Sequence, residues 1–195
     1  MDPQERKQLI LDRSATIFAR KGVSATTIRE IADAVGVHSG ALYHYFPSKE
    51  AIVTELIRQY IVDLSRRCEA VLARGLGPVE RLVALATVAL ETSAEYHGAT
   101  SIWRREGDYM RERLVEADMA ATADVMEVAW REAIAEGVDA GMLRADIDPQ
   151  VFQEIIYDSV WHASRWFTPT PENTLADLAR TVITILVDGM RNPNA

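Results

Sequence analysis

The sequence of 195 residues contains a single cysteine, Cys68, so an intramolecular disulfide is excluded. This shortage fits a reducing cytoplasm, where thiols stay free. The sequence also lacks a run of about 18 apolar residues, the length that a membrane-spanning helix needs. Its first ten residues carry no apolar segment behind a basic cluster, as a secretory signal peptide would. We therefore predict a protein of the cytoplasm that makes no use of a membrane.

The common catalytic patterns are missing as well. The sequence contains no G-x-S-x-G, no H-E-x-x-H, no phosphate-binding P-loop and no dinucleotide-binding glycine pattern. His97 near Glu95, or His162 near Asp158, would form an acid–base pair, but neither pair has a nucleophile beside it. We expect no catalytic residue, no metal and no cofactor, and an enzyme is the less favoured hypothesis.

Basic residues are fewer than acidic ones, 21 against 29, which gives a net charge of −8. The imbalance is uneven, because residues 1–50 hold seven basic and six acidic residues, whereas the remaining 145 hold fourteen and twenty-three. The net charge alone argues against a nucleic-acid partner. A near-neutral first quarter with locally clustered basic residues still permits contact with a phosphate backbone, so charge leaves the question open.

The apolar residues recur with helical spacing almost throughout, and no alternating pattern predicts a strand. An Asp-Pro pair at residues 2–3 predicts the start of a first helix, and Gly22 its end. Thr27 and Glu30 form a capping box that predicts a second helix, which Gly36 ends. We expect an all-α fold.

The glycine-rich linker 75–78 predicts a domain boundary in its neighbourhood. We assign residues 1–66 to an N-terminal domain and residues 67–195 to a C-terminal domain. Further helices are expected over 36–46, in a long segment from residue 48, near 79–97, 100–105 and 109–137, from 149 to about 166, and over 174–190.

Residues 36–46, "GVHSGALYHYF", follow the second helix directly across a glycine turn. Two helices in this order predict a helix-turn-helix, whose second helix enters the DNA major groove. His and Ser side chains can bond base edges, an Ala methyl can contact a thymine methyl, and Tyr and Lys can reach phosphates. A small helical bundle can imitate this spacing. The expected DNA contacts are Thr27, Arg29, His38, Ser39, Gly40, Ala41, Tyr43, His44 and Lys49.

The side chains in this stretch also suggest a metal site and a packed corner. His38 and His44 are six residues apart rather than four, and no cysteine is near, so a zinc site is not expected. Leu42, Tyr45 and Phe46 can share one face, and we expect them to point into the core formed by the first three helices.

The run "ATTIREIADAVGVHSGALYHYFPSKEAIVTEL" (25–56) resembles the DNA-binding region of the TetR family of bacterial transcriptional regulators. Its "HYF" departs from the more usual "HHF" or "YHF" at Tyr45, an inward position. The resemblance implies a dimeric repressor that binds double-stranded DNA and whose divergent C-terminal domain binds a small ligand. The positions that match the family pattern are Thr27, Ile31, Ala32, Gly36, Val37, Leu42, Tyr43, Phe46, Lys49 and Glu50.

All four tryptophans lie in the C-terminal part, with tyrosines, methionines and arginines among them. An apolar aromatic pocket with a few fixed polar groups is typical of a small-molecule site, although each such residue can equally be part of the core. The predicted ligand-binding residues are Trp103, Arg104, Tyr109, Trp130, Trp161, Arg165 and Trp166.

Residues 157–172, "YDSVWHASRWFTPTPE", and residues 136–152, "EGVDAGMLRADIDPQVF", resemble segments of actinobacterial TetR-family repressors of steroid catabolism. That resemblance implies an acyl-CoA thioester as effector, and neutral aromatic compounds are the second choice. Trp161 and Arg165, four residues apart on a helix, would present a ring and a charge to an anionic ligand. Alternatively, Arg165 pairs with Asp158 or with an acidic residue of a second protomer, and Trp166 packs in a dimer interface.

The last two helices are expected to form a homodimer interface, with apolar residues of 174–190 and 150–163 at a two-fold axis. The favoured hypothesis is a repressor that an effector releases from its operator. A DNA-binding or adaptor protein without a ligand is the alternative outside the enzyme class.

Overall fold

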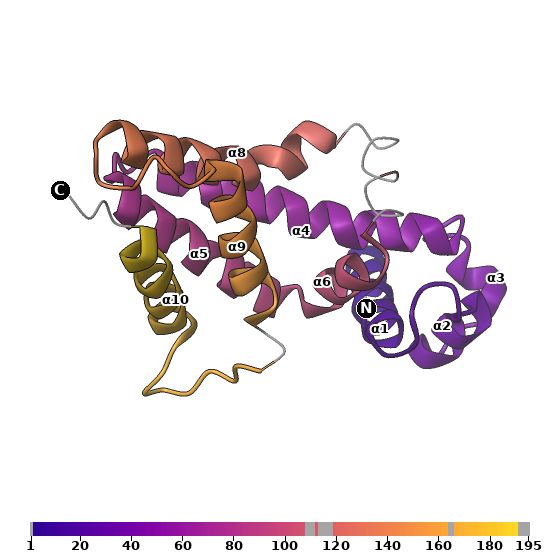
Figure 1. Cartoon of the computed structure of the whole chain (residues 1–195). Helices are drawn as coiled ribbons and strands as arrows, with labels where there is room; N and C mark the ends of the chain where they lie inside the picture. Colours follow the sequence, from indigo (N-terminus) through magenta and orange to yellow (C-terminus); the bar gives the residue numbers. More distant parts are fainter. Residues whose placement is uncertain (1, 108–111, 113–118, 164–165, 191–195) are drawn as a thin grey trace. The chain divides into compact units, whose positions relative to one another are not determined.

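Figure 1 shows the computed structural model of the chain, which describes residues 2–107, 112, 119–163 and 166–190. Regular structure in these residues is entirely helical, as expected. None of the described helices is both long and apolar enough to cross a membrane. The helices are α1 (Pro3–Lys21), α2 (Ile28–Val35), α3 (Ser39–Leu42), α4 (Lys49–Leu72), α5 (Pro78–Glu95), α6 (His97–Arg105), α8 (Ala120–Asp139), α9 (Pro149–Trp161) and α10 (Leu175–Met190).

The chain divides into two compact units, and the division falls inside α4. Unit 1 comprises residues 1–62 and 96–121, and unit 2 comprises residues 63–95 and 122–195. Helix α6 therefore belongs to the same unit as α1, α2 and α3. The linear assignment of residues 1–66 and 67–195 to two domains stays a prediction.

In unit 1, helix α1 begins with the predicted cap. The Asp2 side chain accepts from the Glu5 backbone N–H at 2.8 Å, and the Glu5 carboxylate accepts from the Asp2 N–H at 2.9 Å. Helix α6 packs on α1. The two approach closely at Gly98, because a Cβ added there would lie 2.4 Å from the Ala15 Cβ.

In unit 2, α10 packs against α5, and α9 packs against both. Arg67 joins the start of this unit to the end of α5, since its guanidinium pairs with both Asp63 and Glu95. Cys68 is fully buried, and its Sγ lies 3.7 Å from the Met126 Sδ. The fully buried side chains on these helices include Leu82, Leu85, Trp130, Ile134, Phe152, Ile156 and Ile183.

Several helix bounds differ from the sequence-based expectation. The expected third helix over 36–46 is only the four residues of α3, because bonds of the 3₁₀ type, such as His44 N–H to Ala41 C=O at 3.3 Å, follow it. The helix expected up to about 166 ends at Trp161. Helix α6 starts three residues before the expected 100, and α8 extends to Asp139, beyond the expected end at 137. Residues 109–111 and 113–118 of that expected helix lie outside the described residues.

Candidate DNA-binding surface and effector site

Helix α2 is held at both ends by the groups that the sequence predicts. The Thr27 hydroxyl accepts from the Glu30 backbone N–H at 3.2 Å, and the Glu30 carboxylate accepts from the Thr27 N–H at 2.9 Å. Gly36 ends the helix with φ +72°, a left-handed conformation that glycine adopts without strain. Helix α3 then packs on α2, so the helix-turn-helix arrangement is present in unit 1.

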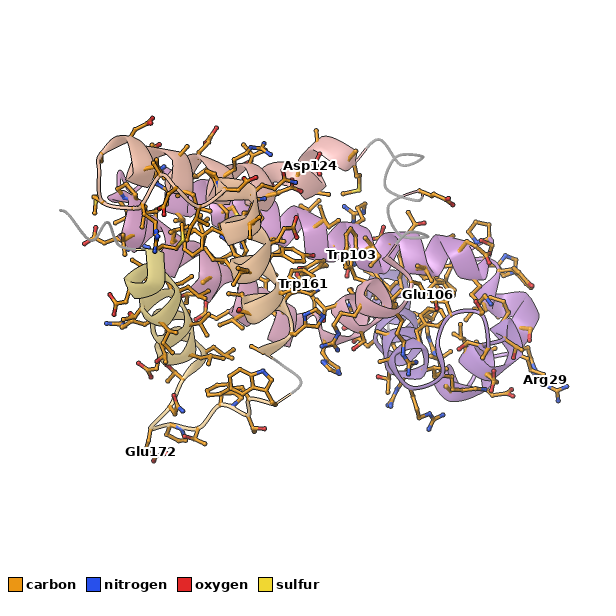
Figure 2. The ribbon with its side chains drawn as sticks, viewed as in Figure 1. Arg29, Trp103, Glu106, Asp124, Trp161 and Glu172 are labelled. Atoms are coloured by element: carbon orange, nitrogen blue, oxygen red, sulfur yellow. The ribbon has the colours of Figure 1, made fainter. Side chains whose placement is uncertain are left out.

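The side chains expected to contact DNA lie mostly on the outside of these two helices. Arg29 points away from α2 (Figure 2), and its side chain is 86% exposed with only a 3.9 Å approach to Asp33. Tyr43 is 52% exposed. Thr27, His38, Gly40 and His44 are exposed, and Ser39 and Ala41 are half-buried. Of the residues expected to face the core, Leu42 and Phe46 are buried, whereas Tyr45 is half-buried.

Lys49 has a structural task in addition to the predicted phosphate contact. Its ammonium donates to the backbone carbonyls of Val23, at 2.8 Å, and Thr26, at 3.0 Å. Both carbonyls belong to the α1–α2 loop (residues 22–26). Because an ammonium group has three N–H donors, one remains for another acceptor.

Glu106 forms another hydrogen bond to the same loop. Its carboxylate accepts from the Val23 backbone N–H at 3.0 Å, directly after the end of α6. The α1–α2 loop, which sets where α2 begins, is therefore bonded by one residue of α4 and one that follows α6. Both residues are far from the loop in sequence, and no local pattern predicts the contacts.

Glu30 adds a charge pair at the base of α2. The hydrogen bond from Lys21 is the main reason why the pKa of this carboxyl falls to about 2, and the Thr27 N–H lowers it further. The carboxylate also lies in the first turn of α2, where negative charge is favourable.

In unit 2, three aromatic rings form a connected cluster, which we call the ring cluster: Trp130 of α8 with Tyr157 and Trp161 of α9. Tyr157 meets the edge of Trp130 with centroids 6.3 Å apart, and stacks on Trp161 at 5.3 Å and 11° between the ring planes. Trp130 is 1% exposed and Trp161 9%. Gln153, one helical turn before Tyr157, is also buried. The structure thus brings together two of the predicted ligand-binding residues, and Tyr157 connects them.

Two buried polar atoms in this unit have no hydrogen-bond partner among the described residues. They are the indole Nε1 of Trp130 and the hydroxyl Oγ1 of Thr92, on α5. Leaving a buried donor unsatisfied costs about 1–3 kcal/mol.

The other predicted ligand-binding residues lie elsewhere. Trp103 and Arg104 belong to unit 1, where Arg104 donates to the Ser101 hydroxyl at 3.2 Å. Trp166 is 66% exposed and meets Phe167 edge to face. Tyr109 and Arg165 lie outside the described residues, so the proposed face shared by Trp161 and Arg165 stays a prediction.

Sequence reasoning missed Thr92 and Glu106. Thr92 lies on an apolar face of α5, where the sequence suggests only a small core residue. Glu106 lies in a stretch whose charge, "WRREGD", indicates a solvated surface. The tertiary contacts give Glu106 its role, and they leave the Thr92 hydroxyl without a partner among the described residues.

The helix-turn-helix of unit 1 and the helical second unit match two family models. Residues 10–56 match that of the bacterial regulatory proteins of the tetR family, and residues 75–190 match the tetracyclin repressor-like C-terminal domain. The chain belongs to the TetR family. It is therefore related to transcriptional regulators, as the sequence resemblance implied.

TetR-family relatives match over nearly the whole chain. The HTH-type transcriptional repressor KstR2 of Rhodococcus jostii (strain RHA1) is 35% identical over 191 residues, which cover 97% of this chain and 93% of that protein. The structure of the ketosteroid transcriptional regulator KstR2 of Mycobacterium tuberculosis superposes with a TM-score of 0.85 at 28% identity, covering 98% and 97% of the two chains. The probable transcriptional regulatory protein RHA5900 gives 0.82 at 33% identity, covering 96% and 100%.

Proposed function

We propose that this TetR-family protein is a repressor that binds a palindromic operator as a homodimer and is released from it by a small-molecule effector. The observation that carries the proposal is the exposed face of α2 and α3 on a helix-turn-helix whose flanking loop is fixed on two sides. The similarity to KstR2 repressors along nearly the whole chain supports it. Such a regulator would act in the cytoplasm, with no catalytic step.

The DNA contacts divide by chemistry. Thr27, Arg29 and Lys49 are proposed to meet phosphates, since they offer hydroxyl or cationic donors at or near helix starts. Tyr43, which directly follows the end of α3, is proposed to meet a phosphate through its hydroxyl. His38, Ser39 and His44, with Gly40 and Ala41, are proposed to face base edges. Residues 1–66 would form the DNA-binding domain and residues 67–195 the effector and dimerisation domain.

The homodimer interface is proposed to lie on α9 and α10, which pack side by side. Their outer faces expose large apolar side chains: Val151 is 51% exposed, Ile155 45% and Ile185 67%. Exposed apolar residues that gather on adjacent helices are typical of an interaction surface. The buried faces of both helices pack within the chain, so the exposed ones are available to a second copy.

The effector is proposed to bind at the ring cluster, with an acyl-CoA as the first candidate class and a neutral aromatic compound as the second. Binding would favour a dimer whose recognition helices no longer match the separation of about 34 Å between half-sites one DNA turn apart. Trp103, Arg104, Tyr109, Arg165 and Trp166 remain proposed contacts.

Operator selection from a random DNA pool tests the central part of this proposal. We expect the selected sequences to converge on an inverted repeat, and Tyr43→Ala to weaken binding to every sequence. Ser39→Ala or His44→Ala should change the preferred bases instead. A pool that yields no inverted repeat would exclude the proposed operator. Binding that no acyl-CoA or aromatic compound releases would favour a regulator without a ligand.

A further inference from the structure

The α1–α2 loop is closed by hydrogen bonds among its own residues. The Thr26 hydroxyl donates to the Gly22 carbonyl at 2.8 Å, and the Thr26 N–H donates to the Val23 carbonyl at 3.1 Å. Thr27, the N-cap of α2, follows Thr26 directly. The position of this closed loop therefore determines where α2 begins.

Two charged side chains from outside the loop hold it at the backbone of Val23. The Val23 N–H donates to the Glu106 carboxylate at 3.0 Å, and the Val23 carbonyl accepts from the Lys49 ammonium at 2.8 Å. Hydrogen bonds to ionised groups are roughly twice as strong as those between neutral groups. Val23 is 3% exposed, and a buried N–H that loses its acceptor is costly. The loop is thus fixed to α4 by one bonded group and to the end of α6 by the other.

Glu106 lies outside the segment that forms the helix-turn-helix. It follows α6, whereas the matched model of the DNA-binding region covers residues 10–56. We propose that Glu106 is a positioning residue for operator recognition, which fixes α2 and α3 through the Val23 N–H and makes no contact with DNA itself. This inference rests on the proposed operator binding by α2 and α3.

The position of α2 and α3 matters more for the recognition of bases than for the attraction of phosphates. Contacts to base edges require side chains within hydrogen-bond reach of particular atoms. The attraction of phosphates is electrostatic and independent of sequence. Because α3 packs on α2, a loop that loses its bond to Glu106 would displace both helices together. Operator binding should then weaken while non-specific binding persists.

The charge of Glu106 gives the two kinds of binding opposite responses. Its carboxylate lines the same surface cavity as Lys49, which is a proposed phosphate contact. Removal of the carboxylate leaves the positive charge of Lys49 less neutralised, so the attraction to any phosphate backbone should stay equal or rise. A loss of operator affinity in such a variant would therefore run against the electrostatic effect.

The test compares the wild type with Glu106→Ala and Glu106→Gln in fluorescence anisotropy titrations of two DNA duplexes. One duplex carries the inverted repeat obtained by operator selection, and the other has the same composition in scrambled order. Both variants lose the charge, but the glutamine amide oxygen can still accept from the Val23 N–H. We expect Glu106→Ala to raise the Kd of the operator about three- to tenfold, as the loss of one hydrogen bond does, with the Kd of the scrambled duplex unchanged or lower. Glu106→Gln should bind the operator with a Kd close to that of the wild type.

Hydrogen exchange at the Val23 amide measures the bond itself. Exchange should be faster in Glu106→Ala than in the wild type, and slow again in Glu106→Gln. Urea midpoints of the three proteins define conditions in which each is folded, so that unfolding does not contribute to the measured Kd.

Three outcomes would overturn the inference. They are a Glu106→Ala protein that binds the operator as tightly as the wild type, an equal loss of affinity for both duplexes, or a Glu106→Gln protein as weak as Glu106→Ala. In each of these cases the wild type still discriminates between the duplexes, and the proposed operator binding stands. A wild type that binds both duplexes equally would overturn the proposed function and this inference with it.

Discussion

The ammonium group of Lys49 has one observed role and one proposed role. It bonds the Val23 and Thr26 carbonyls of the α1–α2 loop, and its third N–H and its positive charge remain for the proposed phosphate contact. If both roles hold, replacing Lys49 should affect both stability and operator affinity.

We expect Lys49→Met, which keeps the aliphatic stem, to lower the free energy of unfolding by about 1–3 kcal/mol, because two bonds to a charged donor are lost. The slope of log affinity against log salt should fall by about 1 if the phosphate contact exists. Urea unfolding and operator titrations at several salt concentrations measure the two effects. Tyr43→Phe is the control, since it should weaken operator binding while the urea midpoint stays unchanged. An unaltered salt slope in Lys49→Met would restrict Lys49 to the loop.

Glu30 gives unit 1 a dependence on pH. Its pKa is about 2 in the folded chain against an ordinary value of 4.5, because Lys21 and the Thr27 N–H bond the carboxylate. A lowered folded-state pKa means that the stabilisation is complete above about pH 4.5 and is lost as the pH falls towards 2.

The change Glu30→Gln should therefore lower the urea midpoint at pH 7, since the Lys21 charge pair is lost while the amide can still accept from the Thr27 N–H. The gap between the two proteins should shrink at pH 3. Glu172→Gln, on an exposed loop, should behave as the wild type at both values. A gap that is the same at pH 7 and pH 3 would mean that the carboxylate charge contributes nothing.

At the scale of helices, α6 packs closely against α1 within unit 1, the unit that carries the helix-turn-helix. Gly98 lets α6 approach α1, and Glu106, which follows the end of α6, bonds the α1–α2 loop. A side chain at position 98 would have to separate the two helices.

Gly98→Ala should thus lower the free energy of unfolding by about 1–3 kcal/mol, as overpacking does. Gly40→Ala provides the matched control, because Gly40 lies in α3 with nothing within 4 Å of an added Cβ. That control should be neutral or stabilising by about 0.5–1 kcal/mol in the absence of DNA. Equal urea midpoints for Gly98→Ala and the wild type would show that α6 can move away from α1 without any loss in the free energy of unfolding.

The sequence was sufficient for those elements whose ends are set locally. The caps at Asp2 and Thr27 and the glycines that end α1 and α2 act within a few residues, so α1 and α2 were predicted almost to the residue. The short α3 and the end of α9 at Trp161 were not, since the apolar spacing continues beyond both.

The candidate sites also divide into features that local sequence predicts and features that only tertiary packing reveals. The outward face of α2 and α3 follows from helical spacing and from the resemblance at 25–56. The bonds of Lys49 and Glu106 to the α1–α2 loop join residues 23 to 83 positions apart, which no local pattern encodes. The unsatisfied Trp130 and Thr92 required the packed structure, because a missing partner can be recognised only when the neighbours are known.

At the scale of the whole molecule, the central expectation is a homodimer. An isologous interface presents each residue twice, so Ile185→Asp would place two charges at the seam of α9 and α10. We expect this variant to sediment as a monomer and to lose operator affinity. Val62→Asp is the control, because Val62 is also exposed, at 44%, but lies on α4. A dimeric Ile185→Asp protein would place the interface on another surface.

Because Cys68 is buried, a cysteine introduced elsewhere in the chain can be labelled selectively. Burial, with the neighbouring Glu69 charge as a lesser cause, raises the pKa of this thiol to about 12, so hardly any thiolate is present at neutral pH. Maleimide and methanethiosulfonate reagents require an accessible thiolate. Cys68 is the sole cysteine, so a thiol introduced at Arg29 would be the only reactive one in each protomer. A spin label attached there would report the separation of the two α2 helices in a dimer. Its distance distribution, recorded with and without effector, would reveal directly whether two spacings coexist.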